Sequence, residues 1–132
     1  FGGCKDNSVE PDETHAEAEG LVLRMNGVDI VIVREGAVTG HLSVHNGTET
    51  DHIDVYFLDH ADTRFRPEGS EYDLGWSIAD TSVAAIERDP GEKWGIHVIG
   101  KAVQTTSVEI RLLHHDHADF RTPSIPIHVT TP

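Results

Sequence analysis

The sequence predicts an all-β protein, an antiparallel β-sandwich of about seven to nine strands that follows a flexible N-terminal tether. From Gly20 onward, short runs alternate apolar with polar residues, and clusters of turn-forming residues separate these runs. No stretch carries an apolar stripe of helical period with capping residues, so long helices are not expected. Regularly spaced strands without helical connections favour two packed antiparallel sheets over one parallel sheet.

The clearest element is an N-terminal hairpin. Residues 21–25 and 28–33 are apolar runs that flank Asn26-Gly27, the strongest short hairpin signal in a sequence. Further strands are predicted, in chain order, at residues 38–44, 53–58, 74–78, 83–87, 94–99, 107–113 and 125–129. The turns between them include Asn46-Gly47, Pro67-Glu68-Gly69-Ser70 and Asp89-Pro90-Gly91.

Charge and length limit the function classes. The chain has 132 residues, with 23 Asp and Glu against 10 Lys and Arg, a net charge of −13. Such a surface repels a phosphate backbone, so nucleic acid is not an expected partner. Residues 1–19 are mostly polar and acidic, which predicts a disordered tether. Residues 20–132 suffice for one domain.

The single cysteine lies near the start of the chain. Phe1-Gly2-Gly3-Cys4 resembles the end of a bacterial lipobox, in which small residues precede a cysteine that is lipidated after signal cleavage. The usual leucine three places before the cysteine is phenylalanine here. The resemblance implies a lipoprotein held to a membrane through Cys4, on the periplasmic or outer face of a bacterial envelope. The alternative is a chance cysteine in a flexible tail.

A second resemblance covers about a third of the chain. Residues 74–86 read Leu-Gly-Trp-Ser-Ile-Ala-Asp-Thr-Ser-Val-Ala-Ala-Ile, and Gly100-Lys101-Ala102 precedes a Thr-rich strand at residues 105–110. This order resembles the bacterial Ig-like group 2 pattern. It implies an antiparallel Ig-like β-sandwich in a surface or envelope protein, although this fold supports many functions.

One tetrapeptide occurs twice in similar surroundings. Asp-His-Ala-Asp follows an apolar strand at residues 59–62 and again at residues 116–119, and each copy is followed by Phe, Arg and Pro. In the Ig-like order, residues 53–58 form the second core strand, 74–78 the third and 107–113 the sixth. The loops that leave the second and sixth strands emerge at the same end of an Ig sandwich, so both tetrads are expected at one tip.

The tip residues predict a site for Zn²⁺ or Cu²⁺, because neutral imidazoles and carboxylates suit these ions. The candidate ligands are His60, His114, His115, His117, Asp59, Asp62, Asp116 and Asp119. The first choices are His60, His115 and His117, with the remaining Asp side chains orienting the rings. The alternative is purely structural: Asp59 and Asp116 form Asx-turns at strand exits, and Arg64 and Arg121 neutralise the carboxylates.

The other histidines suggest only polar surface roles. His97 lies between apolar residues of a predicted strand and is expected to face solvent. His52 and His15 fall in a turn and the tail, and the same surface role is expected for His41, His45 and His128.

No catalytic motif supports an enzyme, since the chain lacks a Gly-x-Ser-x-Gly elbow, a His-Glu-x-x-His pair and a phosphate-binding glycine loop. Two function classes remain. The first is a non-catalytic envelope lipoprotein that binds a transition metal at its tip. The second is a structural or adhesive module that binds an envelope protein or a second copy of itself without a metal.

Overall fold

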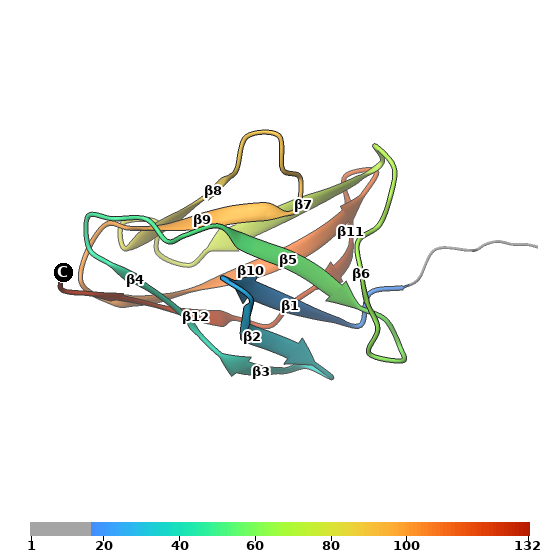
Figure 1. Ribbon diagram of the computed structural model, residues 1–132, viewed down its shortest axis with the longest axis horizontal. Helices are drawn as coiled ribbons and strands as arrows, with labels where there is room; N and C mark the ends of the chain where they lie inside the picture. Colours follow the sequence, from blue (N-terminus) through green and yellow to red (C-terminus); the bar gives the residue numbers. More distant parts are fainter. Residues whose placement is uncertain (1–16) are drawn as a thin grey trace, which may run out of the picture.

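A computed structural model describes residues 17–132, which form two β-sheets without helices (Figure 1). The first sheet has the order β3 (Ala37–Gly40), β2 (Val28–Arg34), β1 (Gly20–Met25), β5 (Ile53–Leu58), β9 (Gly95–Gly100) and β8 (Ala84–Arg88), with β6 (Arg64–Phe65) paired to β5. The second has the order β11 (His117–Arg121), β10 (Thr105–His114), β12 (Ile125–Thr130) and β4 (Leu42–His45), with β7 (Tyr72–Ile78) paired to β10. Cys4 and most of the predicted tether lie outside the described residues.

The strand order confirms the predicted Ig-like sandwich. Strands β1, β5, β9 and β8 are neighbours in one sheet and β7, β10 and β12 in the other, which matches the ABED and CFG sheets of an immunoglobulin fold. The predicted second, third and sixth core strands are β5, β7 and β10. Every strand pair is antiparallel except β12 with β4, which run parallel.

The core lies between the sheets and follows the period of two that the sequence predicts. On β10, Val108, Ile110 and Leu112 are buried, and the residues between them are partly exposed. Phe57 on β5 is fully buried and contacts three aromatic rings at centroid distances of 5.7 to 6.3 Å, those of Trp94, Phe65 and Phe120. These rings come from both sheets and their connections, so one core joins the two layers.

The prediction of one strand at residues 38–44 is wrong. The chain leaves the first sheet after β3 and enters the second as β4. Gly40, at the break, has a φ of +89°, and a Cβ added there would lie 2.2 Å from the Ile30 carbonyl oxygen. Only glycine fits this conformation and this close approach, so the strand ends at residue 40.

The described part of the chain has twelve strands: the nine predicted ranges, one of which divides into β3 and β4, and two further strands. Strand β6 is a two-residue pairing with β5. Strand β11 forms because the chain reverses at His115 and Asp116, whose φ values of 51° and 67° are those of a tight hairpin turn. Its residues then pair back onto the end of β10.

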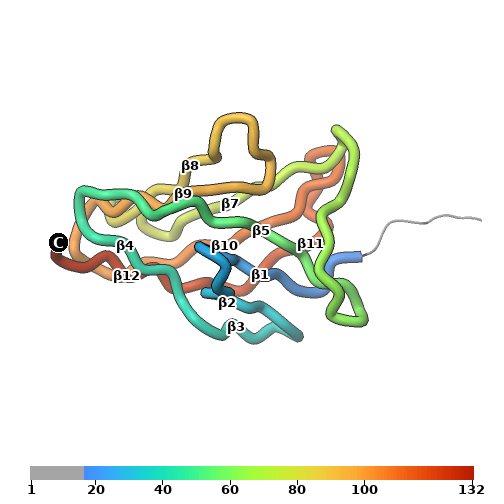
Figure 2. Tube along the Cα trace, viewed as in Figure 1, coloured from blue at the N-terminus to red at the C-terminus, as the bar shows by residue number. Residues whose placement is uncertain are grey.

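The strands run largely along the long axis of the molecule (Figure 2). Residue 17 and the C-terminus lie at opposite ends of that axis (Figure 1). Backbone pairing reaches Glu19, whose N–H donates to the Leu58 carbonyl at 2.7 Å. In residues 17–132 no helix has the length and apolar character that crossing a membrane needs.

Candidate functional site

The two Asp-His-Ala-Asp tetrads lie at the same end of the molecule, as the Ig-like order predicts. The β5–β6 turn carries the first and the β10–β11 hairpin the second, and both lie at the end where residue 17 enters (Figure 1). The two turns are nevertheless separate, because each is held by different neighbours.

The first tetrad is a hydrogen-bonded turn. Asp59 Oδ1 accepts hydrogen bonds from the N–H groups of Ala61 and Thr63, both at 2.9 Å, which confirms the Asx-turn proposed for Asp59. Asp62 forms an ion pair with Arg34 of β2. The His60 side chain is 92% exposed, and its Nδ1 lies 3.3 Å from Glu19 Oε1. A ring this exposed has few neighbouring side chains that could bind the same metal ion.

The second tetrad has a different structure despite its identical sequence. Asp116 lies in the hairpin turn, and His117 and Asp119 belong to β11. The His114 ring stacks between those of Tyr72 and His115, at centroid distances of 4.4 and 4.7 Å. His114 Nδ1 lies 3.3 Å from Asp119 Oδ2. These are pairwise contacts within one hairpin and its neighbour.

The arginines expected to neutralise the tetrads bind elsewhere. Arg64 pairs with Asp29 of β2, and Arg121 lies 3.1 Å from Glu109 Oε1 of β10. Among the described residues, no three of the eight candidate ligands come close enough together to hold one metal ion.

The described residues bring one set of three potential metal ligands together, and it lies away from the tetrads. The set is His52, Asp89 and His97, whose ligand atoms all lie within 4.8 Å of one another. His52 directly precedes β5, Asp89 directly follows β8, and His97 lies in the middle of β9. Strands β5, β9 and β8 are neighbours in the first sheet, so three segments distant in sequence meet here.

Strand alternation puts the two histidines on the outer face of this sheet. Ile53, Ile96 and Val98 are fully buried, so their neighbours His52 and His97 point the other way. Asp89 begins the β8–β9 hairpin turn, where its N–H donates to the Gly95 carbonyl at 2.9 Å. The side chains are 36% exposed for His52, 21% for His97 and 16% for Asp89.

The carboxylate of Asp89 faces both rings, with Oδ2 against His52 Nδ1 and Oδ1 against His97 Nε2. The hydrogen bond to Asp89 is the main cause that raises the pKa of His52, and the bond to His52 lowers the pKa of Asp89. The pKa of His97 is raised first by its hydrogen bond to the Thr50 carbonyl and then by the charge of Asp89. The cluster thus favours cationic partners for Asp89.

Each ring also has a partner for its other nitrogen. His52 Nε2 lies 2.9 Å from Asp54 Oδ1, which accepts a further hydrogen bond from Arg66 at 3.2 Å. His97 Nδ1 lies 2.8 Å from the Thr50 carbonyl oxygen. The nitrogens that point away from Asp89 therefore fix the orientation of both rings. His52 contacts the Asp54 carboxylate, and His97 contacts the Thr50 carbonyl.

Gly95 provides the space for the His52 ring. A Cβ at position 95 would lie 2.2 Å from His52 Cε1 and 3.0 Å from His52 Nε2. The position has no unusual backbone conformation, so the requirement for glycine comes from the ring that packs over it.

His97 points to the outer face of its sheet as expected, but its side chain is only 21% exposed because its ring contacts Asp89 and the Thr50 carbonyl. A signal for the cluster was present in the sequence. His52 directly precedes the strand predicted at residues 53–58, His97 lies on the strand predicted at residues 94–99, and the Ig-like order makes these strands neighbours. The signal lies in the adjacency of these strands and not in any single histidine.

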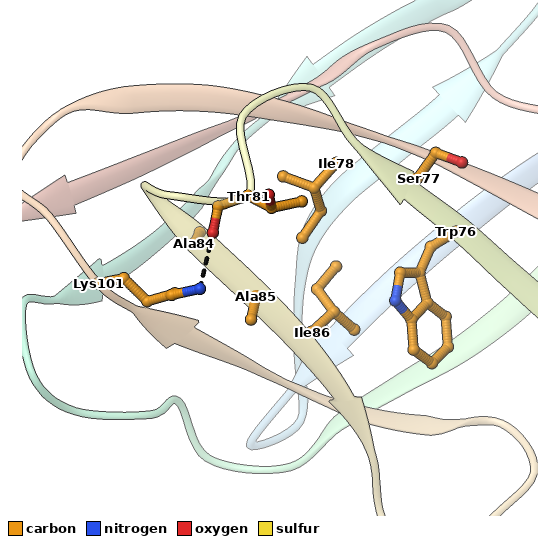
Figure 3. A pocket seen from close by; sticks show the side chains of 8 residues that line it. All are labelled: Trp76, Ser77, Ile78, Thr81, Ala84, Ala85, Ile86 and Lys101. Atoms are coloured by element: carbon orange, nitrogen blue, oxygen red, sulfur yellow. Dashed lines mark hydrogen bonds between the residues drawn. The ribbon is translucent and has the colours of Figure 1, made fainter.

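A groove of about 440 Å³ opens between the free edges of β7 and β8 (Figure 3). Its walls include Trp76 and Ile78 on one side and Ala85 and Ile86 on the other, and Lys101 Nζ donates to the Thr81 carbonyl at 2.8 Å. It is the open seam between the two sheets. Its lining contains none of the histidines and carboxylates described above.

Comparison with known proteins supports the fold. No protein-family model and no curated protein sequence matches the chain. The crystal structure of domains 4 and 5 of the S-layer protein SbsC is similar, with a TM-score of 0.52 and 16% sequence identity. The match covers 97% of this chain and 56% of that chain, so this chain spans just over half of that structure. At this identity the likeness shows a shared fold, and the resemblance to Ig-like group 2 stays a prediction.

Proposed function

We propose that this chain is a non-catalytic structural module of a bacterial cell surface. The observation that supports this most is the similarity of nearly the whole chain to S-layer domains, structures whose name places them in a surface layer. The Ig-like sandwich fits such a role because its stability comes from one shared core, which leaves edges and loops free for contacts. Its partner is an envelope protein or a second copy of the chain, bound through an edge strand or the loop tip.

The module is held at the membrane by lipid on Cys4. Residues 5–19 separate this cysteine from the first strand, a contour of at most about 54 Å. Two acyl chains on a lipoprotein cysteine suffice for stable anchoring. The sandwich would then lie close to the membrane surface. Neither nucleic acid nor a catalytic substrate is proposed as its partner.

Labelling of intact bacteria that express the full-length gene product tests this function. With an alkyne fatty acid in the medium, the protein incorporates label, and a protease added outside the cells removes the sandwich. The matched variant Cys4→Ser is synthesised at the same level without label. Recovery of the unsubstituted protein in the soluble fraction, unlabelled and protected from the protease, would contradict the proposal.

The metal role expected for the tetrads is not part of this proposal. His60, His115 and His117 lie on two separate turns, and their contacts are with Glu19 and within the second hairpin. The ligand atoms that do converge are those of His52, Asp89 and His97.

A further inference from the structure

We propose that His52, Asp89 and His97 bind one Zn²⁺ ion on the outer face of the first sheet. This inference is independent of the surface role proposed above, because it rests on side-chain geometry and not on where the protein lies in the cell.

The ligand types and their spacing suit zinc. Two imidazole nitrogens and one carboxylate oxygen form a ligand set that zinc accepts, and a water molecule then fills the fourth, open position. With bonds of about 2.0–2.2 Å, a tetrahedral zinc ion holds its ligands about 3.3 Å apart. The three ligand atoms already lie within 4.8 Å of one another. Small side-chain adjustments are then needed to bring all three atoms to zinc-bonding distance.

The hydrogen bonds behind the two rings allow both inner nitrogens to bind a cation once the rings are neutral. A neutral imidazole has one N–H, and the acceptors behind the rings, Asp54 Oδ1 and the Thr50 carbonyl, hold that proton on the outer nitrogens. Without a metal, the inner nitrogens contact the Asp89 carboxylate, which can only accept a hydrogen bond, so a proton lies between them. Zinc binding releases that proton and leaves the inner lone pairs and the carboxylate facing the ion. One divalent cation satisfies two lone pairs and a carboxylate together. The alternative is two imidazolium rings around Asp89, which the experiment below distinguishes.

The groups behind the rings are those that zinc-binding histidines require. A ligand histidine almost always donates its other N–H to a carboxylate or a backbone carbonyl, which fixes the ring and increases its basicity. His52 and His97 each have such a partner, at 2.9 and 2.8 Å. Arg66 in turn hydrogen-bonds to the carboxylate of Asp54. This arrangement makes the cluster more than three polar side chains that happen to be near one another.

Zinc at this point joins three segments of one sheet. His52 lies at the entry to β5, Asp89 at the exit of β8 and His97 within β9, so the ion closes a cross-link over the outer face. Since these segments separate when the protein unfolds, the ion binds the folded state and raises its melting temperature.

Titration of the untagged 132-residue chain, stripped with EDTA, tests the site. Cobalt(II) replaces zinc as a spectroscopic probe, and its visible absorption reports four-coordinate binding. We expect one equivalent of Co²⁺ per chain, displaced by one equivalent of Zn²⁺. The zinc dissociation constant is expected below about 10 µM, with a rise in melting temperature of about 5 °C or more at a hundredfold excess over that constant.

Variants separate this site from other histidines. His52→Gln and His97→Gln should each weaken zinc binding at least about tenfold, and Asp54→Asn, which leaves all three ligands in place, should weaken it about 10–100-fold. Gly95→Ala keeps every ligand but displaces the His52 ring, and should also weaken binding. The matched controls His60→Ala/His117→Ala and His41→Ala/His128→Ala should bind zinc like the unsubstituted chain. The second control matters because those two rings lie 4.5 Å apart.

Circular dichroism with EDTA present checks that each variant folds. Absence of saturable binding by the folded, unsubstituted chain would overturn the proposal and would indicate the paired imidazolium rings. Binding that survives His97→Gln but disappears in His60→Ala/His117→Ala would overturn it as well, in favour of the tetrads. Either result leaves the proposed surface role intact, because that role is tested through Cys4.

Discussion

Asp29 on β2 binds two arginines, Arg24 of the adjacent β1 and Arg64 of β6. Arg64 donates to both of its carboxylate oxygens, at 3.0 and 2.5 Å, and Arg24 donates to Oδ1 at 2.9 Å. The hydrogen bonds from Arg64, followed by those from Arg24, lower the pKa of Asp29 below its usual value of 3.8. The folded state therefore binds this proton less readily than the unfolded state does. The resulting stabilisation is present above pH 4 or so and is lost as the pH falls through the lowered pKa.

Asp29→Asn should lower the free energy of unfolding at pH 7 by about 0.5–1 kcal/mol, since the ion pairs are partly exposed and screened. The difference from the unsubstituted chain should shrink as the pH falls below about 4 and through the lowered pKa of Asp29. Urea unfolding at several pH values measures this. Glu68→Gln, at an exposed position, serves as the control and should show no such change. A difference that stays constant with pH would refute the assignment.

Phe57 is the residue on which the core depends most. It is fully buried and contacts aromatic rings from both sides of the sandwich. Phe57→Ala should therefore lower the free energy of unfolding by about 3–5 kcal/mol, through lost burial and the cavity that remains. Val28→Ala, at a valine that is 59% exposed, should change it by less than about 0.5 kcal/mol. Chemical unfolding at pH 7 compares the two. Similar losses would mean that the core is not centred on this ring.

At the scale of elements, the break between β3 and β4 decides how the two sheets are joined. Gly40→Ala places a methyl group 2.2 Å from the Ile30 carbonyl oxygen and strains a φ of +89°, so it should cost more than about 2 kcal/mol. Gly36→Ala has a similar φ of +77° but meets no atom within 4 Å. It should cost only about 1–2 kcal/mol. If both variants lower the free energy of unfolding equally in urea, the close approach at residue 40 does not contribute to stability.

Most strands could be predicted because each has a buried face that produces a period of two in the sequence. Strand β10 is the clear case, and the Asn26-Gly27 hairpin follows from local turn chemistry. The end of β3 could not be predicted, since it depends on where the Ile30 carbonyl lies on the adjacent strand. A glycine inside an apolar run carries no local sign of that neighbour.

The tetrads show the same limit. Residues 59–62 form an Asx-turn. In the second copy, Asp116 forms a hairpin turn together with His115, and the residues that follow pair onto β10. The end of the molecule that they share was predictable from strand order. The separate neighbours that hold them, Glu19 and Arg34 for residues 59–62 and the end of β10 for residues 116–119, were not. Tertiary contacts decided between two structures for one tetrapeptide.

At the scale of the whole molecule, one core shared by both sheets predicts a single cooperative unfolding transition. The two tryptophans allow a test, because Trp76 lies on β7 of the second sheet and Trp94 directly precedes β9 of the first. In Trp94→Phe the fluorescence reports the second sheet, and in Trp76→Phe the first. In each variant the fluorescence midpoint in urea should coincide with that of far-UV circular dichroism. A fluorescence midpoint that precedes the dichroism midpoint would show that the sheets unfold separately.

The proposed zinc ion binds on the outer face of the first sheet, where His52, Asp89 and His97 meet. Anomalous diffraction from crystals of the 132-residue chain grown with Zn²⁺, collected on both sides of the zinc edge, tests this claim most directly. We expect one strong anomalous peak within about 2.0–2.2 Å of ligand atoms from His52, Asp89 and His97. A peak on the tetrads with none at this cluster, or no peak in crystals that contain excess zinc, would contradict the claim.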